Sequence, residues 1–236
     1  MSVVTDTVDW LLDADRWSGG GGVPTRVLEH LGYTGLTMLG AAAVAVPLGL
    51  YIGHTGRLRS AAIGLTGALR ALPTLGVLTW FTLLLGLGLA APILALVLLA
   101  VPPLLAGIYS GVESVDPQTV DAARAQGMTE WQILRRVEVP IGLPLMIGGL
   151  RSATLQVVAT ATVAAYVSLG GLGRYIFDGQ ARRDYPEMAA GAVLVVALAL
   201  VLDGLFALAQ AGAQRAARPS EHRSTAPSST SSSPTT

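Results

Sequence analysis

Long apolar blocks alternate with short polar segments along this chain, and the blocks predict helices that cross a membrane. An apolar stretch of about 20 residues is long enough to span a bilayer as a helix. By this criterion we expect about five spans. They cover 31–53, 72–88, 92–112, 143–169 and 188–212. The pattern therefore predicts an all-α membrane protein.

The second and third expected spans come from one uncharged run, 71–112, which is about twice as long as one span requires. We therefore expect this run to fold back on itself as a helical hairpin. Glycine, alanine and proline concentrate at 86–92, which predicts the turn of the hairpin there. Pro102 and Pro103 are expected to bend the returning helix near the middle of the membrane.

The polar segment 114–142, which we call the elbow, separates the third and fourth expected spans. Asp116 followed by proline predicts a helix start, and Gly127 suits the left-handed position that ends such a helix. Thr129 with a glutamine three residues later matches a capping box, so a second helix should begin at once. That helix is expected to stop before Pro140, because the residue before a proline disfavours helical backbone angles. The segment thus predicts two helices joined at a glycine.

Both ends of the chain lack an apolar block of span length. Residues 1–26 are acidic and then glycine-rich, without the positive start and apolar core of a signal peptide. They predict either a short helix on the membrane surface or a loosely ordered leader. Serine, threonine and proline dominate 216–236, a tail that cannot bury a core and is expected to be disordered. The membrane domain then occupies 27–215.

The amino-acid composition argues against several kinds of functional site. The chain is 52% hydrophobic and 13% charged with no net charge, so no basic field invites nucleic acid. It has no cysteine, and its three histidines are far apart in sequence, which gives a metal site little support. All 15 cationic residues counted as Lys or Arg are arginine. A Walker A loop requires lysine, so this chain cannot supply a standard P-loop ATPase by itself. We also expect no catalytic residue and no cofactor in this chain.

The elbow resembles a known motif. Its Asp-Ala-Ala sequence at 121–123, followed by Gly127 and later by Pro140, is similar to the EAA loop of bacterial ABC importer permeases. Aspartate replaces the usual glutamate, which keeps the charge on a shorter side chain. The resemblance implies a cytoplasmic coupling helix that docks on a dimer of ATPase subunits, where ATP and Mg would bind. An ordinary amphipathic loop is the alternative. The coupling residues that the resemblance to the EAA loop implies are Asp121, Ala122, Ala123, Gly127, Met128 and Pro140.

Three further stretches, 23–35, 68–81 and 158–188, are similar to permeases for osmoprotectants. This resemblance implies a type I ABC importer permease fold and the import of glycine betaine, choline, carnitine or a similar quaternary amine. It also implies two other partners, an extracytoplasmic binding protein and a second permease subunit, identical or homologous. A permease for another small solute, such as an amino acid, is the first alternative.

Two other function classes fit the sequence less well. A secondary transporter often shows inverted repeats or several buried carboxylates, and we find no internal repeat. A membrane-embedded enzyme requires a convergent set of acids, bases or metal ligands, and none is evident. Both classes would work without a nucleotide-binding subunit.

A quaternary amine has no N–H to donate, so aromatic faces and shape must recognise it. Trp80, Phe81 and Tyr166 are the candidates for a substrate path, and ordinary packing is the alternative for each. Charges inside a span also need partners. Arg151 near the start of the fourth span and Asp203 in the last span predict a buried ion pair, unless the arginine reaches the surface alone.

Arginine asymmetry orients the chain in a bacterial plasma membrane. If the elbow is cytoplasmic, so are most of the arginines in connecting segments, whereas Arg174, Arg182 and Arg183 lie outside and oppose the trend. An odd number of spans then places the N-terminus outside and the C-terminus in the cytoplasm. The arginines on the cytoplasmic side would be Arg57, Arg59, Arg124, Arg135, Arg136, Arg215, Arg218 and Arg223.

Overall fold

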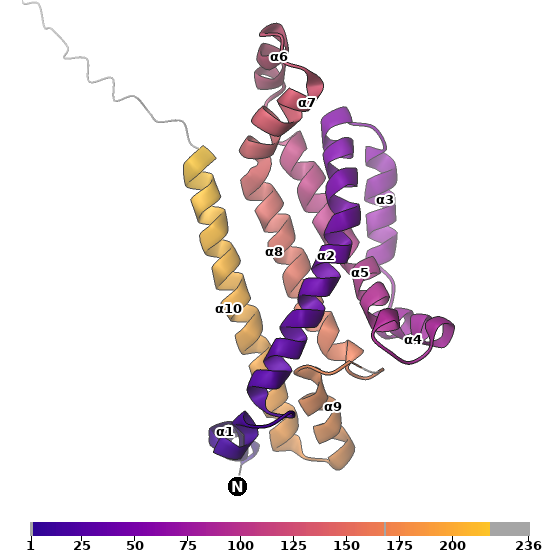
Figure 1. The fold of residues 1–236 in the computed structure, drawn as a ribbon, viewed down its shortest axis with the longest axis vertical. Coiled ribbons are helices and arrows are strands. Elements are labelled where there is room, and N and C mark those ends of the chain that lie inside the picture. Colours follow the sequence, from indigo (N-terminus) through magenta and orange to yellow (C-terminus); the bar gives the residue numbers. More distant parts are fainter. Residues whose placement is uncertain (1, 168, 218–236) are drawn as a thin grey trace, which may run out of the picture.

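The computed structural model describes residues 2–167 and 169–217, and the regular structure in that part of the chain is helical throughout. Four long helices run along the long axis of the molecule, with short helices at both ends (Figure 1). Segments that contain these four helices are long and apolar enough to cross a membrane. The long helices are α2 (Val23–Thr55), α5 (Ala90–Glu113), α8 (Val139–Ala164) and α10 (Tyr185–Ala217).

The region of the second expected span is bent. α4 (Thr74–Leu85) has 12 residues, and a helix of that length, about 18 Å, is too short for a hydrocarbon core of about 30 Å. It follows α3 (Arg59–Arg70) at an angle of 88°, and only the two together could form a fifth, broken span. Pro73 at the bend has no N–H to continue a helix. The structure thus replaces the straight span expected over 72–88 with a bent pair.

The break between α4 and α5 lies inside the turn expected at 86–92. Gly86 ends α4 with a φ of 81°, a left-handed angle that glycine adopts without strain, and α5 begins at Ala90. α5 then continues as one helix through Pro102 and Pro103.

The elbow leads into α8 without leaving the helix. α7 (Glu130–Ile133) continues through η2, a π-helical segment (Leu134–Glu138), directly into α8. In a regular α-helix the ring of Pro140 would clash with the carbonyl one turn earlier. The π-helical segment changes the register, since the Val139 N–H donates to the carbonyl of Leu134, five residues back. The helix stop expected before Pro140 is therefore wrong, and the fourth span begins well before 143.

α5 lies at the centre of the bundle, against α2 on one side and α8 on the other. Glycines set the α5–α8 distance: a Cβ on Gly107 would overlap the backbone of Gly149, and one on Gly142 would overlap the backbone of Gly111. The core around this contact is aliphatic and includes Ala100, Leu104, Ile108, Val112 and Val157. Close backbone approach through small residues is a usual way for membrane helices to associate.

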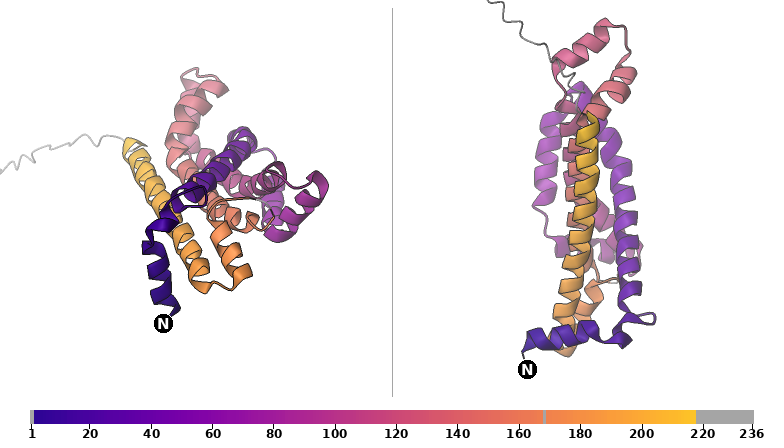
Figure 2. Two further views of the ribbon diagram at one scale, coloured as in Figure 1. Left: turned by 60° about the horizontal axis from the view of Figure 1, so that its bottom comes forward. Right: turned by 90° about the vertical axis from the view of Figure 1, so that its left-hand side faces the viewer.

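The two ends of the bundle carry different short helices. α6 (Pro117–Ala125), α7 and the C-terminal end of α10 lie at one end (Figures 1 and 2). At the other end are α9 (Gly173–Arg182), η1 (Ala14–Trp17) and α1 (Val3–Leu12), which lies across the bundle (Figure 2).

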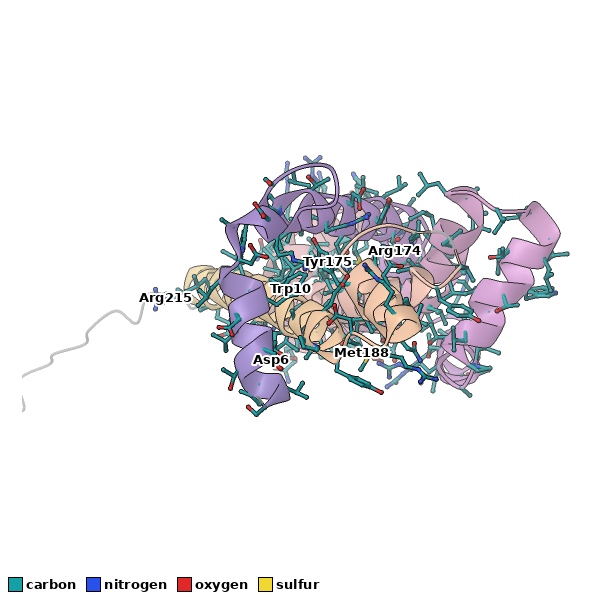
Figure 3. The ribbon with its side chains drawn as sticks, turned by 90° about the horizontal axis from the view of Figure 1, so that it is seen from below. Asp6, Trp10, Arg174, Tyr175, Met188 and Arg215 are labelled. Atoms are coloured by element: carbon teal, nitrogen blue, oxygen red, sulfur yellow. The ribbon has the colours of Figure 1, made fainter. Side chains whose placement is uncertain are left out.

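The N-terminal segment and the tail differ in what the structure describes. α1 is held to the bundle by Trp10, whose ring packs edge-on against Tyr175 at a centroid distance of 5.2 Å (Figure 3). Trp10 is thus buried rather than placed at a membrane surface. Of the expected tail, 218–236 lies outside the described residues, as does Ser168 in the expected fourth span.

Candidate functional site

The first helix of the elbow has a side-chain cap at its start. The Asp116 carboxylate accepts a hydrogen bond of 2.8 Å from the N–H of Gln118, and Pro117 occupies the first turn, where its missing N–H costs nothing. These two residues fix where α6 begins relative to the end of α5.

The same helix ends in a Schellman motif. The Gly127 N–H donates to the carbonyl of Arg124 at 2.9 Å, and the Met128 N–H donates to that of Ala123 at 3.2 Å. Gly127 has a φ of 83°, so any other residue there would be strained, although a Cβ would meet no atom within 4 Å. Gly127 therefore turns the chain by its backbone freedom and not because space is short.

The second helix begins two residues later with the expected capping box. The Thr129 N–H donates to the Gln132 side chain at 2.9 Å, and the Gln132 N–H donates to the Thr129 hydroxyl at 3.4 Å. Both sides of the Gly127 turn are thus closed by hydrogen bonds within the elbow itself.

A small apolar core lies between the two helices. Val115, Val120, Ala123 and Ile133 are buried in it, and Met128 packs against them. The two alanines of the motif therefore differ, because Ala123 is buried in this core whereas Ala122 is exposed on the outer face of α6. Ala122 and Ala125 leave room on that outer face between the longer side chains of Gln118, Asp121 and Arg124.

Charged groups connect the helices across the turn. Arg124 makes a two-pronged contact with Glu130, from Nε to Oε1 at 2.8 Å and from Nη2 to Oε2 at 3.0 Å. Its third nitrogen donates to Asp121 at 3.0 Å. The hydrogen bonds that Arg124 donates to Glu130 raise the pKa of its guanidinium above the ordinary value, so it stays charged. Exposed ion pairs add little stability, but a bidentate pair fixes geometry.

His54 joins the elbow to α2 and was missed from the sequence. Its Nδ1 lies 2.6 Å from Oε2 of Glu138, and its Nε2 lies 3.2 Å from Oε2 of Glu130. Beside it is a cavity of about 190 Å³ that Glu113, Asp121 and Arg124 also line. No local signal marks this contact, because the residues that form it are about 80 positions apart and meet only in the folded chain.

The aromatic candidates form two separate pairs. Trp80 and Phe81 of α4 pack edge-on at 5.6 Å, and Tyr166, just after α8, packs against Phe177 of α9 at 5.4 Å. Trp80 is 59% exposed and lines an apolar cavity of about 260 Å³ between α4 and α5. Phe81 packs on a core cluster that contains Ala161 and Ala164 of α8.

Arg151 of α8 and Asp203 of α10 lie together, with Nε–Oδ1 and Nη2–Oδ2 distances of 2.6 and 2.7 Å. Both side chains are 32% exposed, so the pair is partly covered rather than fully buried. It connects α10, which also packs against α9 and α1, to the helix that continues from the elbow.

The end opposite the elbow has its own polar contacts. Glu29 of α2 accepts the Gly171 N–H at 2.8 Å and pairs with Arg26 at 2.9 Å. The Tyr175 hydroxyl donates to the Gly21 carbonyl at 2.6 Å, and burial raises the pKa of that hydroxyl. Among the described residues, no group of three or more His, Asp or Glu side chains is placed to hold a metal ion.

The chain matches, over residues 45–215, the family described as binding-protein-dependent transport system inner membrane component. The chain belongs to this family. It is a multi-pass membrane protein and a permease, a component of a transporter rather than an enzyme.

Its curated relatives are permeases of similar length. The permease is 33% identical to the glycine betaine/carnitine/choline transport system permease protein OpuCB of Bacillus subtilis, over 82% of this chain and 89% of that protein. It is 32% identical to the choline transport system permease protein OpuBB of the same organism, over 84% and 94%. It is 30% identical to the osmoprotectant import permease protein OsmW of Salmonella typhimurium, over 85% and 94%.

Solved structures share the fold. A chain of the MetNI methionine ABC transporter, in an inward-facing conformation, aligns with a TM-score of 0.69 at 22% identity, over 79% of this chain and 93% of that one. A chain of an amino acid ABC transporter solved with histidines aligns with a TM-score of 0.65 at 18% identity, over 90% and 99%. The permease therefore has the all-α fold of type I ABC importer permeases.

Proposed function

We propose that the permease is the membrane subunit of an ATP-driven importer of quaternary-amine osmoprotectants, such as glycine betaine, choline or carnitine. Relatives that carry these substrates in their names, each covering most of this chain, support the substrate class. An external binding protein delivers the solute, and a second permease subunit completes the path. ATP and Mg bind to a separate ATPase dimer, since this chain has no lysine for a Walker A loop.

The observation that carries the proposal is the internally braced elbow at one end of the bundle. Type I importers open and close when their ATPases move, so a permease must transmit force through a surface that does not deform. Asp121, Arg124 and Glu130 hold the two elbow helices together, and Gly127 and Met128 close the turn between them. Motion of a docked ATPase would then pass through Pro140 into α8 as a rigid unit.

ATP can drive the cycle only if the ATPase binds the two permease conformations with different affinity. The exposed outer face of α6, with Ala122 at its centre, would be the docking face. The elbow end is then cytoplasmic, the N-terminal segment with α1 is extracytoplasmic, and α10 ends in the cytoplasm. Exposed arginines at the elbow end, such as Arg135 and Arg136, support this orientation.

The aromatic residues near the opposite half are proposed to line the solute path. Trp80 and Phe81 lie on α4 and Tyr166 follows α8, so a path between those segments would expose ring faces to a quaternary ammonium group. Such a path needs only weak contacts, because the binding protein supplies selection before the solute reaches the permease.

Uptake in reconstituted vesicles tests the proposal. Vesicles that contain the permease, its ATPase and its binding protein should accumulate labelled betaine, choline or carnitine. They should do so only when ATP is present on the side of the membrane that holds the ATPase. Methionine and histidine are the competing solutes, since the solved structures that share this fold include a methionine transporter and an amino acid transporter solved with histidines. Accumulation of an amino acid alone would contradict the proposed substrate class. Uptake without any ATPase would contradict the proposal that the importer is driven by ATP.

A substitution at the turn tests the role of the elbow. Gly127→Asp places a strained residue and a negative charge beside the Asp121–Arg124–Glu130 cluster, in open space that leaves the bundle intact. We expect normal membrane insertion and continued ATP hydrolysis, with uptake per ATP reduced roughly tenfold. Wild-type uptake per ATP in this variant would argue against a rigid elbow.

A further inference from the structure

His54 lies at the last turn of α2 and faces two carboxylates from two successive parts of the elbow. Nδ1 lies 2.6 Å from Glu138, in the π-helical segment, and Nε2 lies 3.2 Å from Glu130, at the start of α7. Both nitrogens of one ring are therefore occupied by carboxylate oxygens. Glutamates 130 and 138 are in turn eight positions apart, so the ring spans two turns of helix.

The two ring nitrogens of His54 can each form a hydrogen bond with a carboxylate. A carboxylate accepts hydrogen bonds, and only the imidazolium form of histidine donates from both nitrogens. Because Glu138 is only 5% exposed, removing His54 would leave a buried carboxylate without a partner, and such a group is costly.

His54 also connects the ion pairs of the elbow to α2. Glu130 is already held by Arg124, which holds Asp121, so the ion pairs run without a gap from α6 through α7 and η2 to α2. The chain itself joins the elbow to α5 and α8 only. In the described part of the permease, the ion pairs that join the elbow to α2 are those of His54.

α2 is placed to carry such a force along the bundle. It packs along α5 for much of its length, and near its other end Glu29 holds the Gly171 loop beside α9. A displacement of the elbow that is transmitted to α2 would therefore reach the opposite end of the permease by a second helix besides α8.

We propose that His54 is a positioning residue that couples the elbow to α2, so that α2 and α8 move together when the ATPase moves. The proposal rests on the proposed coupling role of the elbow. Other charged groups around the ring are Glu113, Asp121 and Arg124 in the adjoining cavity and Arg59, which pairs with Glu113 at 2.8 Å. Arg59 joins α3 to α5, and its ion pair within the described residues is with Glu113 and not with an elbow residue, which makes it a matched control.

The test compares uptake per ATP hydrolysed in the assembled complex for His54→Gln, His54→Arg, Glu138→Gln and the control Arg59→Gln. His54→Gln removes the ring that reaches both carboxylates and should reduce uptake per ATP roughly tenfold while ATP hydrolysis continues. His54→Arg offers several N–H donors to the same carboxylates and should recover most of the loss. The double variant His54→Gln/Glu138→Gln should be no worse than either single variant, because both remove the same contact.

Hydrogen exchange of the elbow amides supplies a readout that does not depend on transport. We expect faster exchange over 116–133 in His54→Gln than in wild-type permease, with no such change in Arg59→Gln. Unchanged exchange together with wild-type uptake per ATP would overturn the proposal, and so would an equal loss in Arg59→Gln or a His54→Arg variant as uncoupled as His54→Gln.

The Gly127→Asp variant separates this proposal from the function on which it rests. If Gly127→Asp uncouples the importer and His54→Gln does not, the link to α2 is wrong and the coupling role of the elbow stands. If neither variant changes uptake per ATP, the coupling role itself is wrong, and the role of His54 is overturned with it.

Discussion

The elbow and the α3–α4 pair are both places where a helix changes direction sharply, and they are held in opposite ways. In the elbow, the Gly127 turn is closed by a Schellman motif on one side and a capping box on the other, and Arg124 spans it. Its shape is therefore fixed by groups that it contains.

The 88° bend between α3 and α4 has few such supports. Neither helix start has a side-chain cap, and Leu58 before α3 adopts a φ of 63°, unusual for a residue with a branched side chain. The surface is also apolar, since Leu83 is 79% exposed and Leu87 is 82% exposed. We expect lipid or a second permease subunit to cover such a region.

The difference teaches that one surface of this fold is stiffened by its own hydrogen bonds, whereas the other depends on neighbours that cover it. A surface that transmits force to a water-exposed partner must be stiff by itself, so it is polar and its hydrogen bonds are satisfied. A surface that lipid or another subunit covers can leave its shape to those neighbours. The following substitutions test this distinction, from the largest expected effect to the smallest.

The largest effect is expected at the α5–α8 contact, on which both regions depend. Gly107→Val would drive a side chain into the backbone of Gly149, forcing the helices apart and destabilising the bundle by about 1–3 kcal/mol or more. The amount of folded permease recovered in detergent should fall sharply. Gly204→Val in α10 is the control, because a Cβ there meets nothing within 4 Å. Equal recovery of the two variants would contradict the close packing.

An intermediate effect is expected from the elbow network. Arg124→Lys keeps the charge but cannot make the two-pronged contact with Glu130, and we expect uptake per ATP to fall roughly fivefold with little change in folding. Arg135→Lys is the control, since Arg135 is exposed and forms no ion pair within the described residues. Matching losses in the two variants would show that the two-pronged contact with Glu130 is not the cause of the loss.

A smaller effect is expected at the pair between α8 and α10. Asp203→Asn removes one charge, and we expect roughly a twofold loss of assembled, active permease. The exchange Arg151→Asp/Asp203→Arg should recover part of it, because the attraction is restored with opposite polarity. Assembly and transport that remain normal in Asp203→Asn would remove this pair from the account.

The smallest effect is expected in α3, and its sign is informative. A Cβ at Gly64 meets nothing within 4 Å in the isolated chain, so Gly64→Ala should stabilise α3 by about 0.4–1 kcal/mol. Thermal unfolding of the detergent-solubilised monomer measures it, with Gly56→Ala as a control that should lose stability because Gly56 has a φ of 65°. A gain in the monomer but a loss in the assembled importer would place a neighbouring subunit against this face.

The features that could be predicted from the sequence are those that involve residues close together in the chain. The Asp116 cap, the Gly127 turn and the Thr129 capping box involve residues a few positions apart, so the pattern of the elbow was readable before folding. The proline bend before α4 was readable in principle, because Pro73 breaks the apolar run, but uniform hydropathy there favoured one straight span.

Interactions between distant segments were not readable in the same way. Glu130 appeared in the sequence only as part of a helix start, yet it accepts from Arg124 and contacts His54. The π-helical segment lets the helix continue through Pro140, where the rule that a helix stops before a proline predicted an end. Arg151 and Asp203 could be paired in advance only because charges inside apolar helices restrict their partners.

Site-specific cross-linking tests the central claim most directly, since the chain has no cysteine and single cysteines can be introduced cleanly. We predict that Gln126→Cys, at the exposed tip of the elbow, cross-links to the ATPase in an ATP-dependent manner, whereas Gly20→Cys at the opposite end does not. In intact cells, an impermeant thiol reagent should label only Gly20→Cys. Labelling of Gln126→Cys from outside the cell, or its cross-linking to the binding protein, would contradict the account.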